Sequence, residues 1–455
     1  MEKSEGDELI GGTLNTAGAF LMRSTRIGAD TALAQIIEMV RRAQSSKPAI
    51  ARLVDRVAAV FVPVVVTIAI ITFVAWLIGG PQPRIAYAVV TAMTVLVIAC
   101  PCALGLATPI SIMVGVGRAA QLGILVRNGE ALQQSGRITT VVLDKTGTIT
   151  QGRPRVARIL PAGGIGEQQI LGLAASLEVA SEHPLGAAIV EEARARGLDF
   201  SSAAEFRAHP GRGVSGRLDG QLLRLGNLAL MTESGISPGG VAEMPASPAA
   251  QGETMVHLAI DGSYAGLIAI ADPLKPDSIA AVKRLLELGL RVVMLTGDDE
   301  TTARAVAGKL AVEEVVSGVL PGGKAAEIAR LQRSGEVVAM VGDGINDAPA
   351  LAQADVGMAI GTGTDVAIES ADIALMRGSL DAVADAVILS RATLRNIKQN
   401  LFGAFIYNVL GIPLAAGLLY PFTGLLLSPV FAAAAMSMSS VTVVANALRL
   451  NRIRL

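Results

Sequence analysis

Residues 139–148 read TTVVLDKTGT, so a short apolar run stops at an aspartate, a lysine and a Thr-Gly-Thr turn. Such a run predicts a buried strand, and the glycine lets the backbone turn sharply behind it. A carboxylate at a strand tip can attack a phosphoryl group and form an aspartyl-phosphate. We therefore predict Asp144 as a nucleophile, beside the charge of Lys145 and the hydroxyls of Thr146 and Thr148. Taken alone, the motif could also be an ordinary turn.

Two other apolar runs, residues 292–295 and 337–341, also end at polar clusters. In open α/β sheets, ligands bind at the carboxyl ends of the strands, so we expect these clusters to meet. Asp343 and Asp347, two carboxylates four residues apart, suit Mg²⁺, and a lysine can neutralise the charge of a transferring group. The other residues predicted to surround the phosphate are Thr296, Gly297, Asp298 and Lys324. Each piece alone could be a polar loop, but together and in this order they favour phosphoryl transfer.

The rest of the chain predicts membrane spans beside soluble parts. Of 455 residues 51% are hydrophobic, and the net charge of −1 gives no sign of a nucleic-acid partner. Two nearly adjacent cysteines exclude a disulfide framework. Residues 57–78, 85–117 and 399–448 carry no charge, and residues 421–424 offer a turn that divides the last stretch. These lengths predict four spans in two pairs, with buried core helices of a large soluble enzyme as the alternative.

Basic residues fix the orientation of these spans. Arginines and lysines flank the outer ends of each pair, whereas the short loops within the pairs hold only Arg84. The positive-inside rule therefore places residues 118–390 in the cytoplasm. Short β-branched runs alternate there with helical stretches, which predicts an α/β domain with a parallel sheet.

The second span contains Cys100-Pro101-Cys102 in its middle. Residues two apart lie on nearly opposite faces of a regular helix. However, Pro101 lacks an N–H and clashes with the carbonyl of Val97, so the helix must kink or unwind. Both sulfurs could then approach one soft ion such as Cu(I) or Zn²⁺. The alternative is a proline kink flanked by two buried thiols.

The second pair of spans favours a monovalent ion. Tyr407 and Asn408 lie in the third span, and Met436, a soft thioether, lies with Ser439 and Ser440 in the fourth. Neither span holds Asp, Glu, His or Lys. Because two thiolates only just neutralise a divalent ion, the missing carboxylate favours Cu(I) over Zn²⁺, Cd²⁺ or Co²⁺. Ligand chemistry does not separate Cu(I) from Ag(I).

About 200 residues separate Asp144 from Asp343, more than a minimal α/β core needs. This spacing predicts an inserted domain at residues 154–265. Within it, His183 stands in Ser-Glu-His-Pro, and a lone histidine is more often structural than functional.

DKTGT, TGD and GDGINDAP together resemble the P-type ATPases, whose phosphorylation domain has a haloacid-dehalogenase-like fold. The resemblance implies that Asp144 takes the γ-phosphate of ATP, that Asp343 and Asp347 help to hold Mg²⁺, and that residues 272–276 form a hinge. Ser-Glu-His-Pro is similar to a nucleotide-domain signature of heavy-metal members, which implies that His183 orients ATP. The resemblance adds to the nucleotide site Glu178, Gly211, Gly213, Gly226 and Asn227.

Cys-Pro-Cys, Tyr-Asn and Met-x-x-Ser-Ser together resemble the Cu(I)-exporting subgroup. Zn²⁺ and Cd²⁺ exporters share the first motif but carry Lys and Asp in the later spans. Asp55 matches an ion-admitting carboxylate of copper pumps, or is a solvated helix-end charge. The resemblance also implies a cytoplasmic copper donor such as a copper chaperone. The ion ligands it implies are Cys100, Cys102, Tyr407, Asn408, Met436 and Ser440.

The expected protein is a multidomain membrane protein of the cell membrane. It has four transmembrane helices and a cytoplasmic α/β haloacid-dehalogenase-like phosphorylation domain with an inserted α+β nucleotide-binding domain. The expected order is residues 1–50, the end of a β-rich actuator domain; 51–117, the first span pair; 118–153 and 266–390, the phosphorylation domain; 154–265, the nucleotide domain; and 391–455, the second pair.

The resemblance predicts ATP-driven export of Cu(I) with Mg²⁺ as cofactor. Because residues 6–50 resemble an actuator domain after its TGE loop, we expect a truncated chain that binds ATP but turns over poorly. The alternatives are Zn²⁺ or Cd²⁺ export, a metal-binding fragment without transport, and a membrane-tethered phosphatase. The inserted domain and the Cys-Pro-Cys motif disfavour the phosphatase.

Overall fold

The computed structural model describes residues 22–23, isolated positions between 34 and 44, and residues 48–453 apart from 182, 238–251, 344–346 and 362–370. The predicted actuator remnant lies almost entirely outside the described residues. The chain divides into two compact units. The first comprises residues 1–138, 371–377 and 385–455, and the second comprises residues 139–370 and 378–384.

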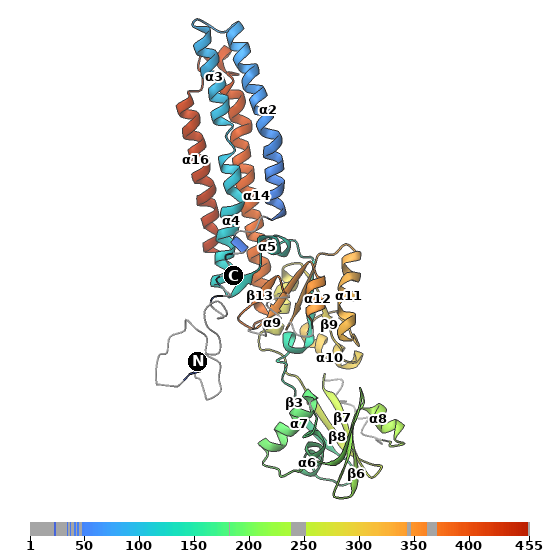
Figure 1. Cartoon of the computed structure of the whole chain (residues 1–455). Coiled ribbons are helices and arrows are strands. Elements are labelled where there is room, and N and C mark those ends of the chain that lie inside the picture. Colours follow the sequence, from blue (N-terminus) through green and yellow to red (C-terminus); the bar gives the residue numbers. More distant parts are fainter. Residues whose placement is uncertain are drawn as a thin grey trace. The chain divides into compact units, whose positions relative to one another are not determined.

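Long helices dominate the first unit and run side by side (Figure 1). They are α2 (Ala49–Gly79), α3 (Arg84–Ile98), α4 (Cys102–Gln121), α14 (Asp381–Ala415) and α16 (Pro429–Leu448). Within the described residues, three helical segments are long and apolar enough to cross a membrane: 49–79, 84–121 and 429–452. The remaining predicted span lies in α14, whose uncharged part, residues 399–415, follows a charged first half.

The first unit also contains smaller elements. They are β1 (Ile124–Val126), which pairs antiparallel with β13 (Ile373–Leu375), and the short helices α5 (Gly129–Ser135) and α15 (Tyr420–Thr423). The loop between α3 and α4, residues 99–101, interrupts the second predicted span at its Cys-Pro-Cys motif. The interruption is the one that Pro101 predicts, since a proline cannot continue the hydrogen-bond ladder.

Aromatic side chains join the helices at the end of the bundle where α2 turns into α3. The ring of Trp76 stacks on Tyr87 with centroids 6.0 Å apart and meets the ring of Tyr420 edge-on at 4.9 Å. Its indole N–H donates to the carbonyl of Ala416 at 2.9 Å. Such amphipathic rings are typical of a membrane–water interface. This cluster therefore marks one membrane boundary of the bundle.

A parallel sheet forms the core of the second unit. Its strands are β2 (Thr140–Asp144), β9 (Arg291–Leu295), β10 (Glu314–Val316), β11 (Val338–Gly342) and β12 (Val356–Ile360). They lie in the order β12-β11-β2-β9-β10 and are all parallel. The helices of this part are α9 (Ser278–Glu287), α10 (Glu300–Leu310), α11 (Pro321–Arg333) and α12 (Ala348–Gln353). The three strands predicted from sequence are neighbours, so their carboxyl ends meet at one edge.

A second, antiparallel sheet lies between β2 and β9 in sequence. Its strands are β3 (Arg155–Pro161), β4 (Ala204–His209), β5 (Gly213–Leu218), β6 (Gln221–Gly226), β7 (Thr254–Ile260) and β8 (Ser263–Ala271), in the order β3-β8-β7-β6-β5-β4. Helices α6 (Glu167–Glu178) and α7 (Pro184–Ala195) pack on it around a common apolar core, and α8 (Leu228–Glu233) follows β6 (Figure 1).

The two ends of this insertion meet in a short stem. Thr150 forms an antiparallel bridge with Leu274, and the N–H of Gln151 donates to Pro273 at 2.8 Å. The hydroxyl of Thr150 also donates to Asp272 at 2.6 Å. The chain therefore leaves the parallel sheet and returns to it at one point, within the segment predicted as a hinge.

Candidate active site

The predicted nucleophile lies in a buried group of opposite charges. Asp144 ends β2, Lys324 lies in the first turn of α11, and Asp347 directly precedes α12. The Lys324 Nζ donates to Asp144 Oδ1 at 2.6 Å and to Asp347 Oδ1 at 2.6 Å. The three residues are only 5%, 8% and 1% exposed. One lysine thus holds two carboxylates together at the carboxyl edge of the sheet.

Burial and charge change the proton affinity of this group. The pKa of Asp144 is raised to about 7, first because burial removes the carboxylate from water and then because of the negative charge of Asp347. Burial alone would lower the pKa of Lys324, but its contacts with the two carboxylates raise it. The lysine is therefore charged, and the site gathers more negative charge than this one lysine balances.

A second ion pair lies beside the first. Lys145 contacts Asp298, and the backbone N–H of Asp298 donates to the hydroxyl of Thr296 at 3.1 Å. The residues of the second predicted cluster thus reach the strand tip of β2, although Lys145 is paired with a carboxylate. The hydroxyl of Thr148 is fully buried without a hydrogen-bond partner.

Gly147 brings Asp343 next to the turn that follows Asp144. It adopts φ +73°, and a Cβ added to it would come within 3.1 Å of Asp343 Oδ2. The charge of Asp343 also contributes to the raised pKa of Asp144. All four predicted clusters therefore meet in one place, while residues 344–346 of the third cluster lie outside the described residues.

The carboxylates fit a magnesium ion. The Oδ2 atom of Asp347 is buried and accepts no hydrogen bond, so one oxygen of a buried carboxylate is available to a cation. In the described residues, no group of three or more His, Cys, Asp or Glu side chains is arranged to hold a metal by itself. Mg²⁺ typically takes one or two carboxylates and completes its shell with waters and phosphate oxygens, so Asp347 and the nearby Asp343 are the candidate ligands.

Two of the predicted nucleotide residues lie together in the antiparallel sheet region. Glu178 ends α6 and is 8% exposed, and burial raises the pKa of its carboxyl. Its Oε2 has no hydrogen-bond partner and packs so closely on α7 that a Cβ at Gly186 would come within 2.3 Å of it. His183 caps α7 by accepting from Leu185 N at its Nδ1, so its Nε2 is left to carry the proton.

The glycine-rich residues are explained mainly by strand packing. Gly213 and Gly226 pair across β5 and β6, and a Cβ at either would come within 2.2 Å of a backbone carbonyl oxygen. Asn227 caps α8 and donates from its side chain to Gly211 O at 3.0 Å. The resemblance implies that these glycines belong to the nucleotide site. The structure adds a packing requirement that holds without any ligand.

Substitution of Gly226 by alanine should therefore destabilise the antiparallel sheet. A Cβ placed 2.2 Å from Arg212 O forces the strands apart, and overpacking of this kind costs roughly 1–3 kcal/mol or more. We expect a lower melting temperature and weaker ATP binding, measured by thermal denaturation and by nucleotide titration. Gly172→Ala in α6 is the control, since no atom lies within 4 Å of its added Cβ and its helical backbone accepts alanine. An unchanged melting temperature in Gly226→Ala would contradict the packing argument.

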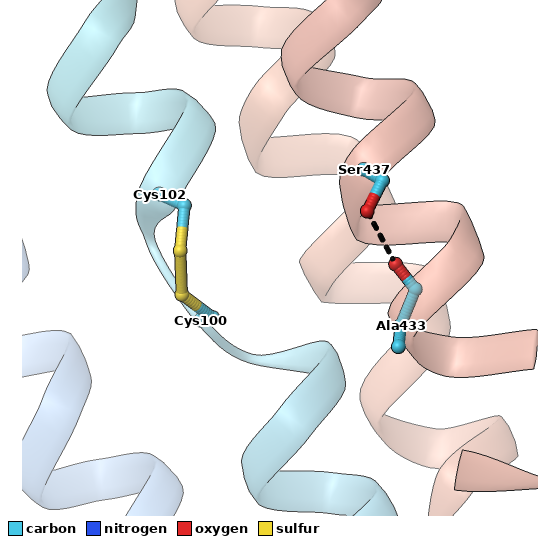
Figure 2. Close-up of a disulfide and its surroundings, with 4 residues drawn as sticks. All are labelled: Cys100, Cys102, Ala433 and Ser437. Atoms are coloured by element: carbon cyan, nitrogen blue, oxygen red, sulfur yellow. Dashed lines mark hydrogen bonds between the residues drawn. A yellow bond between two sulfur atoms is a disulfide. The ribbon is translucent and has the colours of Figure 1, made fainter. Parts of the chain in front are cut away.

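The two cysteines of the interrupted helix are joined by a disulfide (Figure 2). Their Cα atoms are 5.5 Å apart, so the loop between α3 and α4 does bring both sulfurs to one point, as the proline predicts. The sequence argument treated both as thiolates. A soft ion could bind these sulfurs only after reduction, because the thiolate is the metal-binding form.

The other predicted ion ligands differ in their surroundings. Met436 is 8% exposed and lies in the apolar cluster against which Cys100 packs. Asn408 is 3% exposed, and its Oδ1 lacks a hydrogen-bond partner. Tyr407 is 43% exposed on the outer side of α14, and Cys102 is also at the surface of the bundle. Ser440 is partly buried. Met436 and Asn408 are thus the buried members of this set, and Cys100, like Ser440, is partly buried.

Comparisons with known proteins place the chain in a family. A family model of haloacid dehalogenase-like hydrolases matches residues 138–355. A solved structure of a zinc-transporting PIB-type ATPase in the E2.Pi state is 35% identical, with a TM-score of 0.73, and the match covers 93% of this chain and 68% of that one. This chain belongs to the PIB-type ATPases. The predicted haloacid-dehalogenase-like fold and membrane helices are confirmed.

Curated relatives agree with this assignment. A copper-transporting P-type ATPase of Rhizobium leguminosarum bv. viciae is 52% identical over 99% of this chain and 54% of the relative. A silver exporting P-type ATPase of Salmonella typhimurium is 51% identical over 100% of this chain and 55% of the relative. This PIB-type ATPase chain thus spans just over half the length of these relatives. It is a membrane protein, and the family-model match covers its Asp-Lys-Thr-Gly-Thr motif.

Proposed function

We propose that this chain carries the phosphorylation site and the ion site of an ATP-driven exporter of Cu(I) or Ag(I). The observation that supports this most directly is the buried contact of Lys324 with both Asp144 and Asp347 at the carboxyl edge of the parallel sheet. Phosphoryl transfer depends mainly on positioning and charge compensation, and this arrangement supplies both.

In the proposed step, a carboxylate oxygen of Asp144 attacks the γ-phosphorus of ATP. The bond between that phosphorus and the β,γ-bridging oxygen breaks, ADP leaves, and an aspartyl-phosphate remains. Lys324 holds Oδ1 and thereby presents Oδ2 to the phosphate. Mg²⁺ bound by Asp343 and Asp347 would neutralise charge on the phosphate oxygens.

The nucleotide would reach this site from the antiparallel sheet. We assign Glu178 and His183 to nucleotide binding because the buried Glu178 carboxylate, whose Oε2 has no hydrogen-bond partner among the described residues, interacts electrostatically with the His183 ring that caps α7. Gly211, Gly213, Gly226 and Asn227 shape the neighbouring loop. Leu177, which precedes Glu178 in α6, packs on the strand β5 that begins at Gly213, since a Cβ at Gly216 of β5 would come within 2.9 Å of the Leu177 side chain.

Soft ligands support a monovalent cargo. Four side chains could bind a soft ion: the thiols of reduced Cys100 and Cys102, the thioether of Met436 and the amide oxygen of Asn408. When both thiols are ionised, their negative charge neutralises a monovalent ion, so no carboxylate is needed. Relatives named for copper or silver are 51–52% identical, whereas the zinc-transporting structure is 35% identical. Zn²⁺ or Cd²⁺ export is the second candidate. The bilayer surrounds the helices, and we propose a cytoplasmic copper donor such as a copper chaperone.

A metal screen of phosphoenzyme formation tests this proposal. The full chain, with Cys100 and Cys102 reduced, is incubated with labelled ATP, Mg²⁺ and one of Cu(I), Ag(I), Zn²⁺ or Cd²⁺. We expect acid-stable label that depends on Cu(I) or Ag(I) and is lost in Cys102→Ser. Label stimulated only by Zn²⁺ or Cd²⁺ would favour the second candidate. Metal binding without any label would favour a chain that binds metal but does not transport.

A further inference from the structure

A network of neutral polar side chains joins three helices of the bundle. Asn400 of α14 donates from its amide nitrogen to Ser111 Oγ of α4 at 3.1 Å, and its Oδ1 accepts from Asn446 Nδ2 of α16 at 2.8 Å. Asn396, one turn earlier on α14, accepts from Ser111 at 2.9 Å and donates to the backbone oxygen of Asn446 at 2.8 Å. We call these four residues the polar latch.

The polar latch is satisfied internally. Asn400 also donates to Asn396 Oδ1 at 3.1 Å, and Asn446 Oδ1 accepts from Arg449 at 2.9 Å. The hydroxyl of Ser111 has one proton, which it shares between Asn396 and the carbonyl of Ala107 at 2.7 Å. Since the amide groups are already paired, this network is not a vacant binding site. Its contacts serve the helices themselves.

The burial of the latch residues makes their hydrogen bonds important for how the helices pack. Ser111 is fully buried, Asn400 is 3% exposed and Asn396 is 5% exposed. A polar group left without a partner in such a place costs free energy, because no water replaces the lost hydrogen bond. Each helix therefore fits the others in one register, the register that satisfies all four side chains. Slippage of one helix along another would break several bonds at once.

Each helix of the polar latch also carries a proposed ion ligand. Cys102 lies on α4, Asn408 on α14 and Met436 on α16. Counted along the helices at 1.5 Å of rise per residue, the ligands are about 12–18 Å from the latch residues. An apolar layer lies between, formed by small and branched side chains: Ala103, Leu104, Ala107, Ala404 and Val443. The latch residues therefore do not touch the ion.

We infer that the polar latch sets the mutual register of α4, α14 and α16 and thereby positions the soft-ion ligands. Asn400 is its central positioning residue, because its amide bonds to a side chain of each neighbouring helix, whereas the amide of Asn396 reaches α16 at a backbone oxygen. The inference rests on the proposed ion site and adds residues outside it. Breaking the latch should weaken ion binding although every ligand is still present.

The test compares Asn400→Leu, Ser111→Ala and the double variant in the full chain. Leucine has nearly the size of asparagine but lacks the amide that donates to Ser111 and accepts from Asn446. Ser437→Ala is the matched control, because that exposed hydroxyl donates to the carbonyl of Ala433 within its own helix at 3.1 Å (Figure 2). The first measurement is the Kd for Ag⁺, with the cysteines reduced and the reductant removed. The second is hydrogen–deuterium exchange of residues 107–115 and 440–448 without metal.

We expect Asn400→Leu to raise the Kd for Ag⁺ about tenfold, as the loss of one or two interhelical hydrogen bonds implies. Exchange in both segments should accelerate, whereas Ser437→Ala should match the wild type in both measurements. The loss of affinity in the double variant should be smaller than the sum of the two single losses, because both substitutions remove the contact between Asn400 and Ser111. If Asn400→Leu does not fold, Ser111→Ala alone should show the same changes to a smaller degree.

Several results would overturn the inference. These are unchanged Ag⁺ affinity in Asn400→Leu, unchanged exchange, or additive losses in the double variant. Faster exchange with unchanged affinity would reduce the latch to a purely structural contact and would also count against it. A wild-type chain that binds no Ag⁺ would refute the proposed ion site. The role of the latch in setting helix register would then be tested by the difference in hydrogen–deuterium exchange between Asn400→Leu and Ser437→Ala.

Discussion

Asp144→Asn should reduce phosphate incorporation from ATP to below about one-thousandth of the wild-type level, as expected when a covalent nucleophile is lost. Asparagine has the same shape, and its Oδ1 can still accept the hydrogen bond from Lys324 that Asp144 accepts at 2.6 Å. The fold should therefore persist while the carboxylate that forms the acyl-phosphate is absent. Labelled ATP, acid precipitation and release of the label by hydroxylamine measure the effect.

Asp219→Asn is the matched control for this substitution. Asp219 lies in a turn of the antiparallel sheet with φ +51°, a conformation that asparagine accepts readily. It should label like the wild type. Label retained in Asp144→Asn would show that another residue is phosphorylated, and the proposed role of the parallel sheet edge would be lost.

Lys324→Met should both impair labelling and destabilise the second unit. Removal of the lysine leaves Asp144 and Asp347 buried without their cation, and breaking a buried ion pair in this way costs about 3–5 kcal/mol. Loss of one charge-compensating group at a phosphoryl-transfer site should also slow labelling about 100-fold or more. Thermal denaturation and the initial rate of labelling measure the two effects.

Magnesium should partly reverse the loss of stability in Lys324→Met. A cation bound by the same carboxylates stabilises the folded state by mass action, so the melting temperature of the variant should rise more steeply with Mg²⁺ than that of the wild type. Lys283→Met is the control, because Lys283 is 77% exposed and pairs only loosely with Glu287 at 3.9 Å. Equal stability of Lys324→Met and the wild type without Mg²⁺ would argue against the buried cluster.

Much of the active site could be predicted because it depends on local patterns. Apolar runs at residues 139–143, 292–295 and 337–341 each became a strand of the parallel sheet, with bounds shifted by one residue or less. Adjacent parallel strands bring their carboxyl ends to one edge, so the meeting of Asp144 and Asp347 followed from strand order. Pro101 predicted the helix interruption for a similarly local reason.

Other features depend on partners distant in sequence, which no local pattern specifies. The contact of Lys324 with Asp347 as well as Asp144, and that of Lys145 with Asp298, come from how helices pack onto the sheet. The disulfide was not foreseen because the motif itself is equally compatible with two thiols. Asn396 and Asn400 stand four residues apart in α14, a spacing that places them on one helix face. That signal could have drawn attention to the polar latch.

The stem formed by Thr150 and Leu274 has a practical consequence for the antiparallel sheet. The chain leaves the parallel sheet and returns to it at adjacent points. The contacts of the stem therefore hold the two ends of the inserted segment together. The antiparallel sheet is thus an inserted module, which we call the cassette (residues 152–272). It could be deleted and the cut ends joined by a tight turn, and β2 and β9 should keep their register. The cassette itself, whose own termini lie together, offers a natural unit for separate expression.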